Sequence, residues 1–437
     1  MHRMTEGSIA RHLLAYAIPM ILGNFFQLTY NAVDSIIIGK FAGESALAAV
    51  SSANPVMTIV ILGVSGISIG ASVLMSRFYG AGDEESLRRE VATTVLFGAA
   101  ASVVVLLAGL AASGPILRLM NVPPEILPLA TRYLRIIFLG FPFTFQYNIL
   151  AAALRSVGDS RTPVIFLALA SVLNAGLDPV LVGVLHWGVT GAAASTVLAE
   201  AVSALLCAWH IRRRIPILHI REMRVDRALL KETISSGAVT ALQQACQPVG
   251  KALIQSVINA QGITMIAAFN AVSRVDDFAC IPEQSISSGM MTCIAQNRGA
   301  GRRERIGRTL ACGMGIEAAY GVLICLVTLA LKEPLMRLFA AQDGAGMVEM
   351  GVDYLALMAF FYILPGLTNG IQGYFRGMGE MRTTLAATFI QISVRALAVG
   401  LLVPRVGLLG AAWACAAGWC CMLVYAGVRY RRVKKKE

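Results

Sequence analysis

Charged side chains are scarce in this chain of 437 residues. Only 14% of the residues are charged, whereas 57% are hydrophobic, and the mean hydropathy is +0.68. A water-soluble protein of this length needs far more charge to cover its surface. The scarcity excludes an ordinary soluble protein and indicates that lipid is the solvent of much of the folded chain.

The sequence also lacks the motifs of several enzyme classes. Gly39-Lys40 and Gly250-Lys251 lack the rest of the GxxxxGK[ST] phosphate-binding loop, and no HExxH motif is present. The five histidines are scattered, and no two of the nine cysteines have CxxC spacing. We therefore expect no ATPase domain, no structural metal centre, no organic cofactor and no enzymatic activity. The cysteines are expected to be free thiols that pack as small apolar side chains.

The chain contains several long runs without Asp, Glu, Lys or Arg. A membrane-spanning helix needs about 20 apolar residues, and the weak periodicity of these runs favours spans over amphipathic surface helices. The first run is too long for the apolar region of a signal peptide, so it is interpreted as the first span. We predict an all-α polytopic membrane protein with twelve transmembrane helices. The spans are expected at residues 12–36, 46–76, 90–112, 127–152, 162–185, 190–211, 232–258, 263–296, 307–331, 351–374, 383–402 and 407–429.

Basic residues are distributed unequally between the two sets of loops that these spans define. One set, which includes both termini, holds 27 Lys and Arg residues and the other holds 7, while three more lie within spans. The asymmetry predicts cytoplasmic termini in a bacterial-type inner membrane. It also explains the net charge of +12 without nucleic-acid binding. The basic tail at 429–436 is expected to meet anionic membrane lipids.

Four short motifs occur twice, in the same order and at nearly the same offset along the chain. The repeat predicts an N-lobe at 1–211, a cytoplasmic basic linker at 212–231 and a C-lobe at 232–437. Because each lobe has an even number of spans, both insert in the same direction around a central cavity, as in transporters that work by alternating access. Such an internal repeat also lets a monomer work. The repeated pairs are Arg77-Phe-Tyr-Gly-Ala-Gly-Asp with Gln296-Asn-Arg-Gly-Ala-Gly-Arg, Pro115-Ile-Leu-Arg-Leu-Met with Pro334-Leu-Met-Arg-Leu-Phe, Arg155-Ser-Val-Gly-Asp with Arg376-Gly-Met-Gly-Glu, and Gly191-Ala-Ala with Gly410-Ala-Ala.

Asp178 is the most informative of the few charges inside predicted spans. Asn174 lies one helical turn earlier on the same face, and Pro179 cannot donate a hydrogen bond to the carbonyl of Ala175. A carboxylate, an amide and a released carbonyl together suit Na⁺ or a proton. The alternative is a buried polar group that only serves packing.

Asp34 is the second candidate, near the end of the first span. Pro19, earlier in that span, frees the carbonyl of Ala15 and provides a bend or swivel point, and we predict hinges at Pro19 and Pro179. The alternative for Asp34 is a helix-end carboxylate in the headgroup region.

These motifs, in this order within a doubled six-helix layout, resemble the multidrug and toxic compound extrusion family over nearly the whole chain. The resemblance implies cation-coupled antiport of amphipathic organic cations, with an ion site at Asp34, Asn174, Asp178 and Thr196 that holds H⁺ or Na⁺. It also implies that Gln27, Tyr30 and Asn148 line the N-lobe cavity. The motifs that carry it are Pro19 with Asn31-Ala-Val-Asp34-Ser-Ile-Ile-Ile-Gly-Lys40, both Gly-Ala-Gly loops, Leu173-Asn-Ala-Gly-Leu-Asp178-Pro179 and Gly191-Ala-Ala-Ala-Ser-Thr196.

The second half departs from the pattern of one branch of that family, which has an acid in helix 7 and another in helix 10. Here neither helix offers an acid at those places, which argues against a C-lobe sodium site of that type. Lys251, Arg274, Asp277, Glu283 and Arg395 form a predicted C-lobe polar cluster. Its charges either neutralise one another or contribute to substrate binding, and Arg274 and Asp277 can pair along one helix face.

Two functions remain for the cavity. Aromatic rings attract organic cations and methionine adapts to varied shapes, so Tyr30 and Met20 are expected to face a drug-like cation, although most apolar residues near the cavity serve lipid contact or packing. The first function is therefore an antiporter of small organic cations. The alternative is a flippase for lipid-linked saccharides, which the cationic Lys251, Arg274 and Arg395 would favour.

Overall fold

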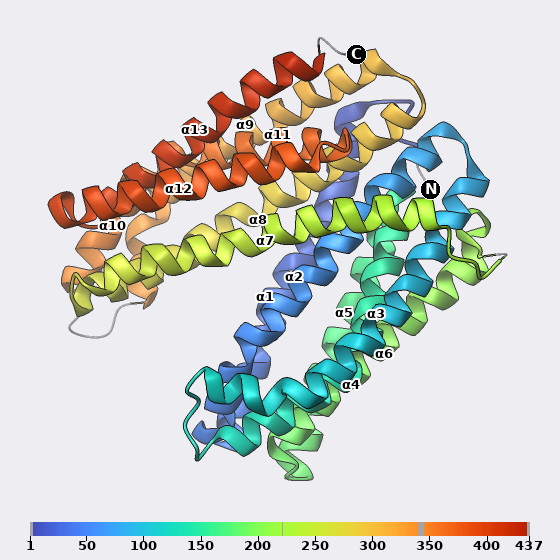
Figure 1. Ribbon diagram of the computed structural model, residues 1–437. Helices are drawn as coiled ribbons and strands as arrows, with labels where there is room; N and C mark the ends of the chain where they lie inside the picture. The colour runs from blue at the N-terminus through green and yellow to red at the C-terminus, as the bar shows by residue number, and fades with distance from the viewer. Residues whose placement is uncertain (1–2, 221, 340–344, 435–437) are drawn as a thin grey trace. The chain divides into compact units, whose positions relative to one another are not determined.

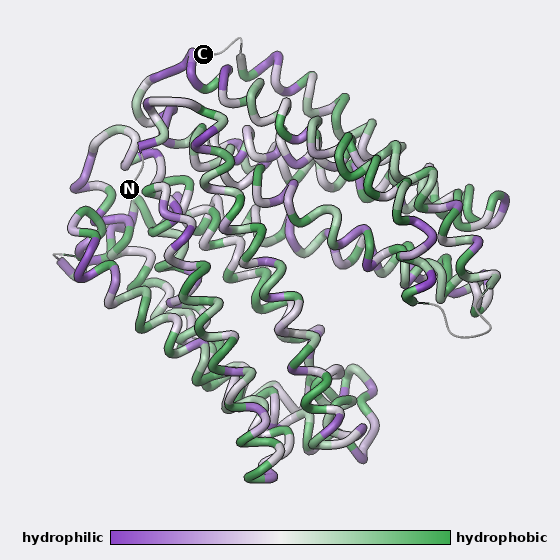
Figure 2. The backbone as a smooth tube through the Cα atoms, turned by 180° about the vertical axis from the view of Figure 1, so that it is seen from behind, coloured by the Kyte–Doolittle hydropathy of each residue, from purple (hydrophilic) through white to green (hydrophobic). Residues whose placement is uncertain are grey.

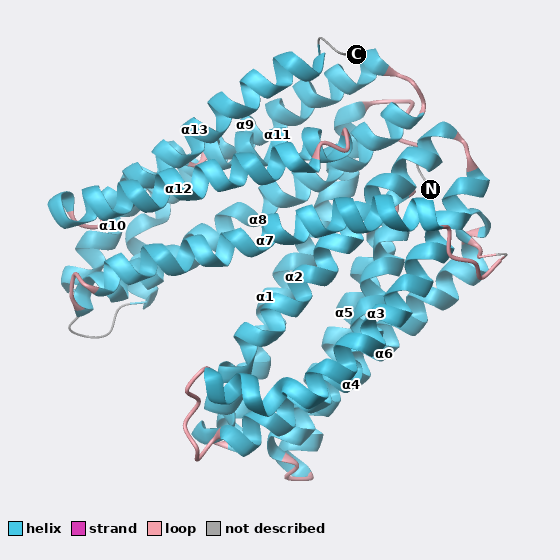
Figure 3. Ribbon diagram, in the orientation of Figure 1, coloured by secondary structure: helices cyan, strands magenta, loops and turns pink. Residues whose placement is uncertain are grey.

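The computed structural model describes residues 3–220, 222–339 and 345–434, and these residues are almost entirely helical, without a strand (Figures 1 and 3). Arg221, Lys435, Lys436 and the side chains of Asn31 and Lys434, which the sequence patterns above include, lie outside the described part. The helices are α1 (Ile9–Ala42), α2 (Glu44–Ala81), α3 (Glu84–Leu119), α4 (Leu127–Ser156), α5 (Arg161–Asp178), a π-helix (Pro179–Val184), α6 (Gly188–Arg214), a 3₁₀ turn (Pro216–Leu218), α7 (Arg227–Asn259), α8 (Ile263–Gly299), α9 (Arg303–Phe339), α10 (Ala345–Phe361), α11 (Ile363–Gly377), α12 (Met381–Val406) and α13 (Leu409–Lys434).

Many of these helices have the length and composition of membrane spans. Nine of those described are long and apolar enough, and α10 with α11, which meet at a bend of 45°, makes a tenth if the pair is one span. Figure 2 shows hydrophobic residues along most of the helices and hydrophilic ones at many helix ends. The all-α membrane fold is confirmed. The count of twelve stays a prediction, because α7 and α8 carry too many polar residues to pass as spans by composition alone.

The chain divides into two compact units, and each mixes residues from both halves of the sequence. Unit 1 comprises Met1–Arg3 and Pro19–Ala241, and unit 2 comprises Met4–Ile18 and Leu242–Glu437. The divisions therefore fall inside α1, next to Pro19, and inside α7. This differs from the predicted lobes at 1–211 and 232–437, because the first part of each lobe's first helix belongs to the other unit. The domain boundaries themselves stay a prediction.

The first part of α7 is held in unit 1 by close helix packing and polar contacts. A Cβ on Gly66 of α2 would lie 2.4 Å from the backbone nitrogen of Ala241, so only glycine lets these two helices approach so closely. Thr233 Oγ1 donates to the buried Glu90 of α3 at 2.6 Å. Leu218 of the predicted 212–231 linker is also fully buried in unit 1, so that linker is partly packed and not a loose tether.

The N-terminal segment is held in unit 2 by the end of α8 and the start of α9. The Met4 amide donates to Gln296 Oε1 at 3.0 Å, and the Met4 carbonyl accepts from Arg305 Nε at 3.1 Å. Arg302 donates to the Thr5 carbonyl at 2.6 Å. Both units therefore fix the first part of a helix that continues into the other unit.

The turns between helices repeat in the two halves. Gly82 and Gly301, which are equivalent positions of the repeat, both have positive φ, and so do the equivalent pair Gly158 and Gly379. Each of the four closes a helix in the left-handed conformation that glycine adopts most easily. The repeated Gly-Ala-Gly and Gly-Asp/Glu motifs therefore encode equivalent turns.

Asp83 begins α3 as its N-cap. Its Oδ1 accepts from the Ser86 amide at 2.9 Å, and hydrogen bonding to Ser86 holds the pKa of Asp83 below its ordinary value. The carboxylate satisfies an amide that has no partner within the helix.

Candidate functional site

A cavity of about 350 Å³ lies within unit 1. Its walls come from α1, α2, α4, α5 and α6, and its size falls in the range of small-molecule sites. All four predicted cavity residues line it, and two of the four predicted ion-site residues do as well. They are Met20, Gln27, Tyr30 and Asn148, followed by Asn174 and Thr196.

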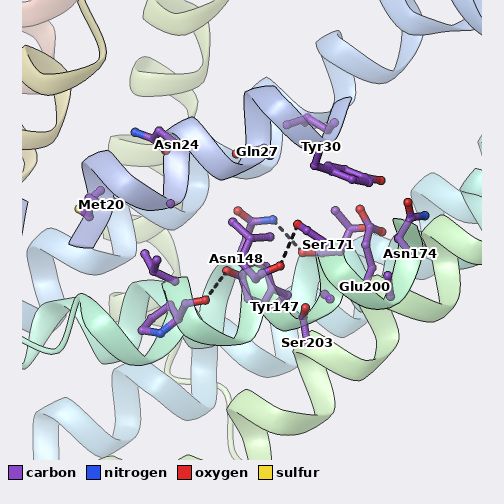
Figure 4. A pocket seen from close by; sticks show the side chains of 18 of the residues that line it. Met20, Asn24, Gln27, Tyr30, Tyr147, Asn148, Ser171, Asn174, Glu200 and Ser203 are labelled. Carbon is purple, nitrogen blue, oxygen red and sulfur yellow. Dashed lines mark hydrogen bonds between the residues drawn. The ribbon is translucent and has the colours of Figure 1, made fainter. Parts of the chain in front are cut away.

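One face of α1 supplies a long side of this cavity. Met20, Asn24, Gln27 and Tyr30 recur every three or four residues, which places them on one helix face. Figure 4 shows them along one length of the helix, opposite side chains from the other walls. The four residues all face the cavity because their spacing follows the helical period.

Asp178 is fully buried at the end of α5 and is held by a residue of α6. Its Oδ1 accepts a hydrogen bond from Ser195 Oγ. Asn174, one turn earlier, donates through Nδ2 to Ser195 Oγ at 3.2 Å and to Thr196 Oγ1 at 3.3 Å. The predicted ion-site residues of α5 and α6 therefore belong to one hydrogen-bonded group.

Asp34 of α1 completes this group. The carboxyl groups of Asp34 and Asp178 lie within hydrogen-bonding reach of each other. The Tyr30 hydroxyl lies within hydrogen-bonding reach of Thr196. A hydrogen bond between two carboxyl groups requires a proton on one of them. The structure thus brings all four predicted ion-site residues together, while their role in coupling stays a prediction.

Three oxygens of the group are buried and receive no hydrogen bond from an N–H or hydroxyl donor of the described residues. They are Asp34 Oδ1, Asn174 Oδ1 and Asp178 Oδ2. Buried polar atoms rarely stay without a partner. Carboxylate and amide oxygens bind a proton or a hard cation, so the residues present fit either H⁺ or Na⁺.

Pro179 marks a change of helix type beside this group. The α-helix ends at Asp178, and Pro179–Val184 forms a π-helix. Proline removes one backbone donor and disturbs the preceding turn, and π-helical turns are often found at functional sites. The released carbonyl of Ala175 and a hinge function of Pro19 and Pro179 stay predictions.

Several polar residues of the site were not predicted from the sequence, and three of them bear on its chemistry. Ser195 binds Asp178, Glu200 lines the cavity and accepts from Thr144 Oγ1, and Arg155 also lines the cavity. Glu200 stood out as a charge inside a span, and Ser195 directly precedes Thr196. Arg155 was not expected in the cavity, because its place at a predicted helix end suggested a cytoplasmic loop.

Acidic and basic groups lie at opposite ends of the cavity. Thr144, which binds Glu200, and Arg155 are on the same helix, and eleven residues of α4 correspond to about 16 Å. No described residue forms an ion pair with Arg155. The cavity can therefore attract a cation at its Glu200 end and repel one at the other.

The predicted C-lobe polar cluster is separated into several groups in unit 2. Asp277 pairs with Lys251, Nζ to Oδ1 at 2.5 Å, with both side chains more than half exposed. It does not pair with Arg274, which is exposed and forms no ion pair with a described residue. Arg395 instead interacts electrostatically with Asp276 of α8. Glu283 is fully buried.

Asp276, a further acid of α8, is the one beside Arg395. Its two carboxylate oxygens accept from the hydroxyl groups of Tyr354 at 3.0 Å and Tyr362 at 2.5 Å. The pairing partners could not be predicted because they depend on the rotation of each helix within the bundle.

Comparisons with known proteins agree with the internal repeat. The family model MatE matches residues 19–180 and again residues 240–401, so the second match follows the first at the spacing of the repeated motifs. The chain is 29% identical to a probable multidrug resistance protein of Bacillus subtilis, YpnP, over 89% of this chain and 87% of that protein. It is 27% identical to a second one, YoeA of the same organism, over 89% of this chain and 85% of that protein.

Solved structures show the same fold. The outward-facing conformation of a multidrug resistance MATE family transporter superposes with a TM-score of 0.91 at 23% identity, covering 99% of this chain and 98% of the other. The doubled match of the family model confirms both the repeated lobes and the predicted family. The chain is therefore a multi-pass membrane protein that belongs to the MatE family, the multidrug and toxic compound extrusion transporters.

Proposed function

We propose that this transporter is a secondary active antiporter that exports amphipathic organic cations in exchange for a small cation. The observation that carries the proposal is the contact between the Asp34–Asp178 group and the substrate-sized cavity. Asn174 and Thr196 belong to both. Binding of one cation near these residues therefore affects the binding of the other, which is the condition for exchange.

The proton is the coupling ion that this geometry favours. The contact between the Asp34 and Asp178 carboxyl groups needs one shared proton, because two ionised carboxylates would repel each other. An organic cation that binds beside the pair replaces the charge of that proton. Na⁺ is the other ion that the oxygens could hold, and it is an outcome that the experiment distinguishes.

The cavity supports organic cations as the substrate class. Tyr30 offers an aromatic ring, Met20 an adaptable thioether and Glu200 a carboxylate, and these are the groups that recognise large cations. The relatives named as probable multidrug resistance proteins support drug-like compounds as substrates.

The lipid-linked saccharide flippase has less support. Of the three cations that would favour an anionic headgroup, Lys251 is neutralised by Asp277, and Arg395 lies beside Asp276. Arg274 alone of the three has no acidic partner in these contacts.

The setting of this exchange follows from the charge pattern. We propose an inner membrane location with both termini in the cytoplasm, and a monomer as the working unit because the repeat supplies two lobes. The exposed basic residues Arg431 and Arg432 near the end of α13 would meet anionic lipid headgroups.

Transport by the purified full chain in proteoliposomes tests the proposal. Ethidium serves as the amphipathic cation, and its accumulation is followed by fluorescence after imposing either a proton gradient without Na⁺ or a Na⁺ gradient at equal pH. We expect accumulation with the proton gradient alone. Accumulation with the Na⁺ gradient alone would assign the site to Na⁺, and no response to either gradient would refute cation-coupled antiport.

A further inference from the structure

Two glutamates in unit 2 are fully buried, although neither takes part in the site described above. Glu283 lies on α8 and Glu317 on α9, and the exposed fraction of each residue is 0%. Both helices lie in the second half of the chain and pack against α11. Neither glutamate belongs to the cavity or to the Asp34–Asp178 group.

The two glutamates lie on neighbouring helices close enough to interact electrostatically. Tyr320, three residues after Glu317, donates its hydroxyl to the carbonyl of Ala279 at 2.8 Å, and Ala279 lies four residues before Glu283. Residues three or four apart share one helix face, so both glutamates lie on the faces of α8 and α9 that this hydrogen bond joins.

The helix α11 closes the third side of the pair. A Cβ on Gly366 would lie 3.4 Å from Glu317 Oε2, so the helix backbone covers that carboxyl group. Asn369 donates through Nδ2 to Glu283 Oε2 at 3.4 Å. Ser287 Oγ donates to the Asn369 carbonyl at 2.6 Å, which fixes α11 against α8.

Three of the four carboxyl oxygens have no hydrogen-bond partner among the described residues: Glu283 Oε1, Glu317 Oε1 and Glu317 Oε2. No Lys, Arg or His of the described chain forms an ion pair with either glutamate. The nearby titratable groups are Cys280 and Tyr320. The neighbouring acid Asp276 is occupied by two tyrosine hydroxyls of other helices.

An ionised carboxylate in such surroundings is costly, because it has neither a counter-ion nor hydrogen bonds to replace water. We propose that Glu283 and Glu317 form a second proton-binding site of this transporter, which holds protons in the conformation described and releases them during the transport cycle. The inference rests on the proposed function and adds a coupling site on helices 8 and 9. It places that site away from the predicted spans at 232–258 and 351–374, where this sequence has no acids at the positions of the family's second cation site.

The bend between α10 and α11 gives this site a route to open. The helices meet at 45°, and Gly366, which covers Glu317, lies in the first turn of α11. A change in the bend would move Gly366 and Asn369 together and uncover the carboxyl groups. Water would then stabilise the ionised form, and the protons would leave.

The number of protons released per ethidium exported tests the inference. The full chain is reconstituted in weakly buffered proteoliposomes, and a pH indicator is calibrated by additions of base. The variants are Glu283→Gln and Glu317→Gln, which keep the shape of the side chain but cannot exchange a proton. Glu333→Gln is the control, because Glu333 lies on the same helix α9, is 57% exposed and pairs with Arg337 on the surface.

We expect the two variants to release fewer protons per ethidium than the wild type and Glu333→Gln. Wild-type export with the same proton count in both variants would overturn the inference and leave the proposed function intact. Export by the wild type without any proton release would instead refute proton coupling in the proposed function, on which this inference rests. If a variant does not fold, the infrared absorbance of protonated carboxyl groups decides. That absorbance should still fall when ethidium binds to Asp178→Asn, in which the Asp34–Asp178 pair no longer contributes, and the absence of any such decrease in that variant would contradict the proposal.

Discussion

Replacement of Asp178 by Asn should abolish the driving force that its carboxyl group provides while preserving the fold. Asp178 is fully buried and accepts from Ser195 Oγ, and asparagine has the same shape and can still accept that bond. The amide cannot share an exchangeable proton with Asp34. Loss of transport from the variant would therefore report on coupling and not on unfolding.

The size of the effect follows from the charge of the group. The Asp34–Asp178 pair with one shared proton has one negative charge, and exchange of that proton for a monovalent organic cation is electrically neutral. The contribution of this pair by itself is driven by the pH difference, at about 1.36 kcal/mol for each pH unit. This corresponds to about a tenfold ethidium gradient for each pH unit. The Asp178→Asn variant should lose at least this factor.

The assay is steady-state ethidium accumulation in proteoliposomes at a series of imposed pH differences. Asp353→Asn is the matched control, because Asp353 is an exposed aspartate of α10, and it should behave as the wild type. A variant Asp178→Asn that accumulates ethidium with the same slope against the pH difference would refute the assignment of Asp178 to coupling.

Other predictions concern packing, capping and selectivity. Gly66→Val should destabilise the protein by several kcal/mol and lower its Tm, because a Cβ would lie 2.4 Å from the Ala241 nitrogen; an unchanged Tm would contradict the close helix packing. Asp83→Ala should cost about 1 kcal/mol of stability through loss of the N-cap bond to Ser86. The lowered pKa of Asp83 means that this contribution is present above its unfolded pKa and is lost as the pH falls through the folded one. Denaturation of wild type and variant at neutral and acidic pH should therefore show a difference that disappears on acidification. Arg155→Gln should strengthen ethidium binding several-fold, because it removes a positive charge from the cavity wall; weaker binding in a fluorescence titration would contradict the orientation of this side chain.

The repeat and the cavity face of α1 could be predicted from the sequence because both depend on spacing along the chain. The turn glycines Gly82 and Gly301 recur at a fixed offset, and Gln27 and Tyr30 follow the helical period. Such spacing patterns can be recognised in the sequence however the helices pack against one another.

The pairing of charges could not be predicted in the same way. Asp277 had Arg274 within reach on its own helix, yet it pairs with Lys251 of α7. Helices that are apolar on all sides give little indication of which face meets which neighbour. The partners of a polar side chain then depend on helix rotation, which only the folded structure shows.

The bend between α10 and α11 illustrates another limit. The residue between the two helices is Tyr362, which has no intrinsic tendency to break a helix, and Pro365 lies three residues later. The predicted span at 351–374 crosses this point without interruption. The hydroxyl of Tyr362 bonds to Asp276, and this tertiary contact was not visible in the sequence.

The dependence of ethidium affinity on pH, measured at equilibrium with the purified full chain, tests the central claim most directly. If the organic cation and the proton compete for the Asp34–Asp178 group, affinity should fall as the pH is lowered. The dependence should be strongly reduced in the double variant Asp34→Asn, Asp178→Asn. An affinity that does not change with pH in the wild type, or a dependence that the double variant retains in full, would contradict the account.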